Sequence, residues 1–108
     1  MKILFDHGTP APLRHALTGH VASVSHELNW HKLDNGELLD AAEPLFDLLI
    51  TTDKNIKHQQ NLSGRRLGIL VLPTTSWPVI QKHLPLVSET VNSMQPGEYR
   101  ELAFPPKP

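Results

Sequence analysis

Short runs of apolar residues alternate along the chain with segments in which apolar residues recur every three or four positions. The short runs predict five β-strands, at residues 2–6, 20–25, 46–52, 67–72 and 98–104. The run at 67–72 is nearly all aliphatic, which is typical of a strand buried on both faces of its sheet. Strands that alternate with helices favour a parallel sheet and right-handed crossovers. The predicted fold class is therefore α/β, a three-layer α/β/α sandwich with a mainly parallel sheet of four to five strands.

The segment after the first strand carries the signals of a helix start. Thr9 offers an oxygen that can cap the first turn, and Pro10 fits the first helical position, where its missing N–H costs nothing. Gly19 predicts the end of this helix. The ambiguous segment 27–33 is interpreted as a loop in which Trp30 and a leucine, Leu33, plug the core.

Three further segments predict helices. One begins near Asp34 or Asn35, and a short polar helix or turn runs through Asn61. A long helix is expected over residues 77–94, capped by Ser76. The inward-facing residues of the first and the last of these helices are expected to be Leu38, Leu39 and Ala42, and Ile80, His83, Leu84, Val87 and Val91, respectively.

The length of 108 residues suits one domain, which we expect to cover residues 1–104, with a proline-rich tail at 105–108. The net charge is −1, so composition imposes no basic patch for nucleic acid. The chain contains no cysteine, which excludes disulfides, thiolate zinc sites and thiol catalysis. No apolar run approaches the roughly 20 residues of a membrane span, and no signal-peptide pattern is visible. We therefore expect a cytoplasmic protein that does not contact membranes.

Two aspartates stand directly after predicted buried strands. Asp6 ends the first strand and Asp53 follows the third. Open α/β sheets bind ligands at the carboxyl ends of their strands, at the point where the strand order reverses. If the first and third strands are neighbours, that point lies between Asp6 and Asp53, and two acids there can hold a divalent cation. The alternative for Asp53 is that it merely caps the following helix.

Glu37 is the third acid that we expect nearby, because it lies in the first turn of the helix between these strands. Three converging carboxylates repel one another unless a cation lies between them, and oxygen ligands suit Mg²⁺ or Mn²⁺. We therefore predict Asp6, Glu37 and Asp53 as catalytic and metal-binding residues. The alternative is structural, since Asp34 and Glu37 have the spacing of a capping box.

A polar cluster follows the second aspartate. Arginine and amide side chains are suited to phosphates and bases, so this cluster could hold a nucleic acid. The alternative is an exposed polar turn. The candidate substrate-binding residues are Asn55, His58, Gln60, Arg65 and Arg66.

The order strand–Asp, acidic helix start, strand–Thr-x-Asp and short helix resembles the PIN-like domains. More narrowly, the chain is similar to a short branch of PIN-like proteins suspected to be toxins of toxin–antitoxin pairs. The resemblance covers residues 1–104 and rests on Asp6, Glu37 and Thr51-Thr52-Asp53. It implies a reduced PIN-like sandwich in which clustered acids hold Mg²⁺ or Mn²⁺ and activate water to cut RNA. It also implies RNA and an antitoxin protein as partners, with a homodimer as a further assembly.

The chain departs from that pattern at several positions. His7 and Gly8 stand where Glu and Asn are common, Asn55 stands where a further Asp is common, and Asn35 stands near a position where an acid is common. Fewer charges weaken metal binding and water activation. The second hypothesis is therefore a catalytically weak or inactive PIN-like module that binds a partner protein. A third, a phosphate-binding domain of response-regulator-like topology, lacks the expected late-strand lysine, since no lysine lies between Lys57 and Lys82.

Overall fold

The computed structural model describes residues 1–105. Of the predicted proline-rich tail, residues 106–108 lie outside the described residues. The five strands are β1 (Lys2–Phe5), β2 (Val21–Val24), β3 (Leu48–Thr51), β4 (Gly68–Val71) and β5 (Tyr99–Glu101). The α-helices are α1 (Asn35–Ala42), α2 (Ile56–Gln59), α3 (Trp77–Gln81) and α4 (Leu84–Ser93), and two 3₁₀ helices are η1 (Ala11–Ala16) and η2 (Ser25–Leu28).

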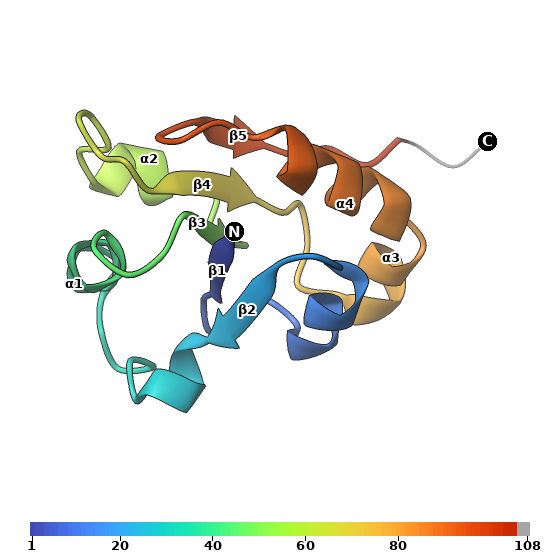
Figure 1. Cartoon of the computed structure of the whole chain (residues 1–108), viewed down its shortest axis with the longest axis horizontal. Coiled ribbons are helices and arrows are strands. Elements are labelled where there is room, and N and C mark those ends of the chain that lie inside the picture. The colour runs from blue at the N-terminus through green and yellow to red at the C-terminus, as the bar shows by residue number, and fades with distance from the viewer. Residues whose placement is uncertain (106–108) are drawn as a thin grey trace.

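All five strands pair in parallel. Their order in the sheet is β2-β1-β3-β4-β5 (Figure 1). The α/β class and the parallel sheet predicted from the sequence are confirmed. The chain leaves β1 toward β2 on one side and later returns to β3 on the other side. The strand order therefore reverses between β1 and β3, which is where α/β sheets of this order bind their ligands.

Helices cover both faces of the sheet (Figure 1). One hydrophobic cluster lies under each group of helices. Side chains of η1, α3 and α4 pack on one face, and side chains of α1 and α2 pack on the other. In β1, Ile3 and Phe5 belong to the first cluster and Leu4 to the second. This alternation is the period-two geometry of a strand. Burial on both sides fixes the register of the central strands and hence the positions of the residues that end them.

The predicted helix over 77–94 is two helices. The cap at Ser76 is confirmed, since its hydroxyl accepts from Val79 N at 3.4 Å. The chain then breaks at Lys82 and His83 before α4 begins. Pro85 explains the break, because a proline inside a continuous helix lacks the N–H for the residue four places earlier and clashes with that residue's carbonyl. At the start of α4 the same proline costs nothing.

The predicted helix after β1 is the short 3₁₀ helix η1, and its cap differs from the prediction. Pro10 occupies the N-cap position, and no side chain caps this helix. The Thr9 hydroxyl bonds to Asp6 and to the Ile50 carbonyl instead. Competition from these partners, one of them a carboxylate, removes the cap expected from the sequence. In the predicted loop 27–33, Trp30 and Leu33 do pack against the core, as expected, after the turn of η2.

The crossovers do not all have the same hand. The β3–β4 and β4–β5 connections advance in the same direction across the sheet. The first passes over the face covered by α2, and the second passes over the opposite face, covered by α3 and α4. Two such connections necessarily have opposite hands, so the expectation that every crossover is right-handed is wrong. The other three connections share one hand, and the connection to the three-residue edge strand β5 is the exception.

Candidate functional site

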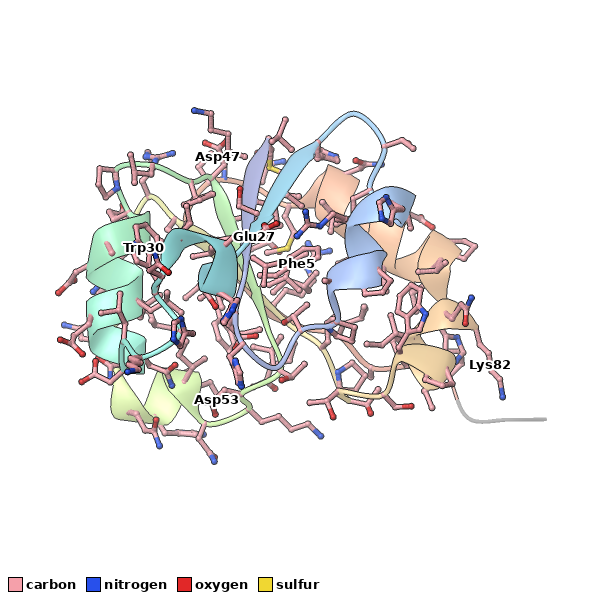
Figure 2. All side chains as sticks on the ribbon, turned by 90° about the horizontal axis from the view of Figure 1, so that it is seen from below. Phe5, Glu27, Trp30, Asp47, Asp53 and Lys82 are labelled. Carbon is pink, nitrogen blue, oxygen red and sulfur yellow. The ribbon has the colours of Figure 1, made fainter. Side chains whose placement is uncertain are left out.

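Asp6 and Asp53 lie at the same edge of the sheet, just beyond the carboxyl ends of the neighbouring strands β1 and β3. Figure 2 shows Asp53 at this edge and Asp47, which precedes β3, at the opposite edge. Both Asp6 and Asp53 are half-buried. The pairing of β1 with β3 therefore brings two acids that are far apart in the sequence to the same edge of the sheet.

Two threonine hydroxyls hold the Asp6 carboxylate. Thr9 Oγ1 lies 2.7 Å from Asp6 Oδ1 and 2.9 Å from the Ile50 carbonyl. Thr51 Oγ1 donates to Asp6 Oδ2. Both threonines are buried, with exposed fractions of 4% and 1%. Buried hydroxyl partners fix the orientation of the carboxylate, because a carboxylate oxygen that lost such a partner would be left with an unsatisfied acceptor.

Thr51 also connects the two strand ends. Its Oγ1 accepts from the Asp53 backbone N–H at 3.1 Å while its proton goes to Asp6. Asp53 Oδ1 in turn accepts from Asn55 N at 2.9 Å. A single hydroxyl therefore fixes the position of the segment that carries Asp53 relative to the Asp6 carboxylate.

Asn35, at the start of α1, lies at the same edge of the sheet. Its side-chain amide donates to Asp53 Oδ2 at 2.6 Å. Asn35 is half-buried, and its side chain carries an amide oxygen as well as the donating nitrogen. Asn35 thus places a neutral amide group in contact with one of the two carboxylates.

The charges of these two aspartates are not balanced by a cation among the residues that the structure describes. Other acids are paired: Glu27 with Arg14, Asp40 with Arg65, Asp47 with Arg66, Glu98 with Arg100 and Glu101 with Lys57. Within residues 1–105, Asp6 and Asp53 form no salt bridge. Two neighbouring carboxylates without a cation, with hydroxyl and amide oxygens beside them, fit Mg²⁺ or Mn²⁺, which prefer oxygen ligands.

Glu37 takes the capping position that its spacing allows. Its Oε1 accepts from Asp34 N at 3.1 Å, and Asp34 Oδ1 accepts from Glu37 N at 2.8 Å. This reciprocal pair is a complete capping box at the start of α1. Across residues 1–105, no three histidine, aspartate or glutamate side chains gather into one potential ligand group. The structure therefore brings together Asp6 and Asp53, and places Glu37 at the exposed end of α1.

Gly8 lets the turn after Asp6 pack closely against the end of β3. A Cβ at Gly8 would lie 2.6 Å from the side-chain oxygen Thr52 Oγ1, so Thr52 would have to shift, and 3.7 Å from Thr75 Cγ2. Glycine at this position therefore lets the turn approach Thr52 without displacing its side chain. A small residue after His7 therefore has a steric reason in the chain's own packing.

Arg65 and Arg66 lie at the other end of the molecule from the two aspartates. Both precede β4, so they stand near the amino ends of the strands. Arg66 donates to Asp47 Oδ1 at 3.1 Å, and Asp47 is labelled in Figure 2 at the edge opposite Asp53. Arg65 pairs with Asp40 of α1 at 2.8 Å. Both arginines thus have partners that tie α1 to the sheet, and the structure does not bring them to the aspartates.

The other candidate substrate-binding residues lie nearer to Asp53. Asn55 and His58 are exposed, and Gln60 is half-buried against the start of α1, where a Cβ at Gly36 would lie 2.9 Å from Gln60 Oε1. Beside them, Lys57 forms a salt bridge with Glu101 at 3.2 Å. These residues surround the carboxyl edge that carries Asp53.

Tyr99 joins this polar group from the edge strand. Its hydroxyl donates to Glu101 Oε1 at 2.8 Å. Partial burial is the largest cause that raises the pKa of Tyr99, followed by the hydrogen bond to Glu101 and the negative charges of Glu101 and Asp53, and the pKa reaches about 12. Tyr99 is therefore a neutral hydrogen-bond donor at physiological pH.

Thr9 and Thr51 were not predicted as site residues, although Thr51 belongs to the strand-end pattern Thr51-Thr52-Asp53. Threonine is common in strands and at helix caps, so each had a sufficient local explanation. The contact of Thr51 with Asp6 depends on the pairing of β1 with β3, which brings residues 45 positions apart into contact. Thr9 contacts Asp6 locally, from three residues further along the chain. A local pattern could have identified Thr51 from the sequence. A threonine hydroxyl at the end of a strand can accept a hydrogen bond from the backbone N–H two residues later, and here that residue is Asp53.

Comparisons with family models, with curated proteins and with solved structures find no match to this chain. Residue roles therefore rest on the geometry described above. In the part of the chain that the structure describes, none of the helices has both the length and the apolar character needed to cross a membrane.

Proposed function

We propose that the chain is a metal-dependent ribonuclease of PIN-like type whose Asp6 and Asp53 hold Mg²⁺ or Mn²⁺. The observation that carries the proposal is the pair of half-buried carboxylates at the β1/β3 strand ends, with no cationic partner among residues 1–105. Mg²⁺ is commonly bound by one or two carboxylates together with waters and substrate phosphates, so two acids are sufficient. Such an ion, when bound, lowers the pKa of water and stabilises the charge that develops on phosphate.

The protein's own residues have separable roles in this proposal. Thr9 and Thr51 keep the Asp6 carboxylate in one orientation, and Thr51 also holds the segment that carries Asp53. Asn35 contacts Asp53, and its amide oxygen is a further oxygen ligand beside the two carboxylates. Glu37 as a third ligand stays a prediction, because its carboxylate caps α1. The same proposal includes a cellular role, in which the protein is the RNA-cutting toxin of a toxin–antitoxin pair.

The first prediction concerns the loss of one carboxylate. Asp6→Asn and Asp53→Asn should each weaken Mn²⁺ binding by about tenfold or more and abolish RNA cleavage, because each removes a charged ligand. Isothermal titration with Mn²⁺ and a cleavage assay on labelled RNA measure the two effects. A shift of the melting temperature with Mn²⁺ checks binding independently, since an ion that binds only the folded state raises it.

Glu89→Gln is the matched control, because it removes one exposed negative charge from α4, on the sheet face covered by the first hydrophobic cluster. It should leave Mn²⁺ binding and cleavage unchanged. Cleavage that survives in both aspartate variants would exclude the mechanism, and so would a wild-type protein that binds no Mn²⁺.

A second candidate function is an inactive PIN-like module that binds a protein partner such as an antitoxin. It is favoured by the hydrogen bonds that already engage both Asp6 oxygens and by the engagement of Glu37 in its capping box. Asn55 adds no charge where a further acid is common. A protein that binds Mn²⁺ with the predicted aspartate dependence but cuts no RNA would favour this second function over the first.

A further inference from the structure

A cleft opens at the carboxyl ends of β4 and β5, next to the strand that leads to Asp53. Its volume is about 420 Å³, within the size range of pockets that hold small ligands. It is lined by Val71, Leu72 and Pro73 at the end of β4, by the segment 101–104 after β5, and by Lys54. The cleft therefore lies on the same edge of the sheet as the candidate metal site, and Lys54 is the residue directly after Asp53.

The walls of the cleft are mainly apolar and well supported. Val71 and Leu72 belong to the two buried clusters, with exposed fractions of 2% and 0%. The Phe104 ring stacks on His83, with ring centroids 4.4 Å apart and an angle of 24° between the planes. An apolar cleft with a fixed aromatic side chain suits a nucleobase, because every base offers a flat face for stacking.

The exposed residues at the cleft differ in charge and in engagement. Glu101 already binds Lys57 and the Tyr99 hydroxyl. Lys54 is exposed and forms no salt bridge among residues 1–105. Its ammonium group can therefore meet a phosphate, and its place in the chain puts that phosphate between the cleft and Asp53.

We propose that the cleft binds one unpaired base of a single-stranded RNA, while Lys54 contacts the phosphate that links this nucleotide to the one at Asp6 and Asp53. The specified substrate is then single-stranded, because the bases of a duplex are stacked within the helix and cannot enter a cleft. This inference rests on the proposed function for the chemistry at the aspartates. Binding of the base can nevertheless be measured without cleavage.

Two variants test the cleft. Lys54→Gln removes the phosphate contact, and Ala103→Leu, at an exposed lining residue, fills the space for the base. Each should weaken binding of a short fluorescent single-stranded RNA by about tenfold, the order expected when one stacking or phosphate contact is lost. Mn²⁺ binding should not weaken in either variant, because neither removes a carboxylate and the loss of the Lys54 positive charge cannot reduce the attraction for a cation. Lys2→Gln is the matched control, since it removes an exposed lysine at the amino end of the sheet.

A second measurement keeps the cleft testable if the protein cuts no RNA. In a titration of the wild-type protein with AMP or UMP, followed by NMR, the amide shifts of residues 71–72 and 102–104 should change. Unchanged shifts there overturn the proposal. RNA binding by both variants that equals that of Lys2→Gln also overturns it, as does duplex RNA that binds as tightly as single-stranded RNA. Absence of Mn²⁺ binding overturns the proposed function instead, and the nucleotide titration then decides the cleft separately.

Discussion

At the scale of single residues, one buried hydroxyl organises the candidate site. Thr51 Oγ1 donates to the Asp6 carboxylate and accepts from the Asp53 N–H. Its exposed fraction is 1%, so water cannot replace either partner at low cost. The two carboxylates that would hold the ion are therefore placed before any ion binds. Such preorganisation by surrounding hydrogen bonds is what orients ligands in metal sites generally.

Tyr99, the single tyrosine of the chain, gives a direct pH-dependent readout of this edge of the sheet. Titration of the folded protein, followed by ultraviolet absorbance, should show ionisation of its hydroxyl near a pKa of about 12. The raised pKa means that neutral Tyr99 stabilises the fold. This contribution is complete below the unfolded-state pKa of about 10 and disappears as the pH rises through the folded value.

Glu101→Gln tests the cause of that shift. It removes the negative charge beside the Tyr99 hydroxyl but leaves its burial, which is the larger cause. The pKa of Tyr99 should fall and still remain above its ordinary value. A wild-type Tyr99 that ionises near pH 10 while the protein is folded would show that the hydroxyl is not held by Glu101.

At the scale of elements, Arg66 joins the end of α1 to the starts of β3 and β4. It donates to the carbonyls of Glu43 and Phe46 at 2.7 and 2.9 Å and to Asp47. Asp47 also accepts from Lys2 N at 2.8 Å, so the same group reaches β1. The sequence analysis allowed an exposed polar turn as the alternative for the segment that contains Arg66. At Arg66 itself, the structure shows a junction that connects α1 with three strands.

Replacement of Arg66 should lower the stability of the fold and leave RNA binding unchanged. Arg66→Met should lower the free energy of unfolding by about 1–2 kcal/mol, because several hydrogen bonds to a partly exposed guanidinium are lost. Arg14→Met, which breaks one exposed pair with Glu27, should cost less than about 1 kcal/mol. Urea denaturation measures both.

The same Arg66→Met protein distinguishes the structural role from a substrate role. RNA binding measured well below the unfolding transition should equal that of the wild type, since Arg66 lies at the amino edge of the strands and Asp53 at the carboxyl edge. Weaker RNA binding without a loss of stability would instead make Arg66 an RNA contact.

At the scale of the whole molecule, the sheet was predictable because its signals are local and repeated. Each strand is a short apolar run, and alternation with helical segments is enough to predict a parallel sheet. The break before Pro85 was also readable in principle, since proline has a known effect inside a helix. The hand of the β4–β5 connection was not, because it depends on which face α3 and α4 cover, and their apolar stripes are compatible with either face.

The candidate site was predictable only in part, for a related reason. Asp6 and Asp53 carry a local signal, the end of a buried strand. The engagement of Thr51, Asn35 and Glu37 depends on long-range pairing or on a choice between two possible partners. For Glu37 the local partner, Asp34, takes the carboxylate. The sequence thus identifies which acids end strands, but the three-dimensional neighbours determine which of them face one another.

We propose above that Asp6 and Asp53 together hold one divalent ion. The most direct test is a crystal structure of the protein grown with Mn²⁺, with the ion located by its anomalous scattering. We predict a manganese peak with oxygens of both Asp6 and Asp53 within about 2.5 Å, which is a typical distance between a hard divalent cation and its oxygen ligands. Crystals saturated with Mn²⁺ in which no ion contacts either carboxylate, with Thr9 and Thr51 still bonded to Asp6, would contradict the account.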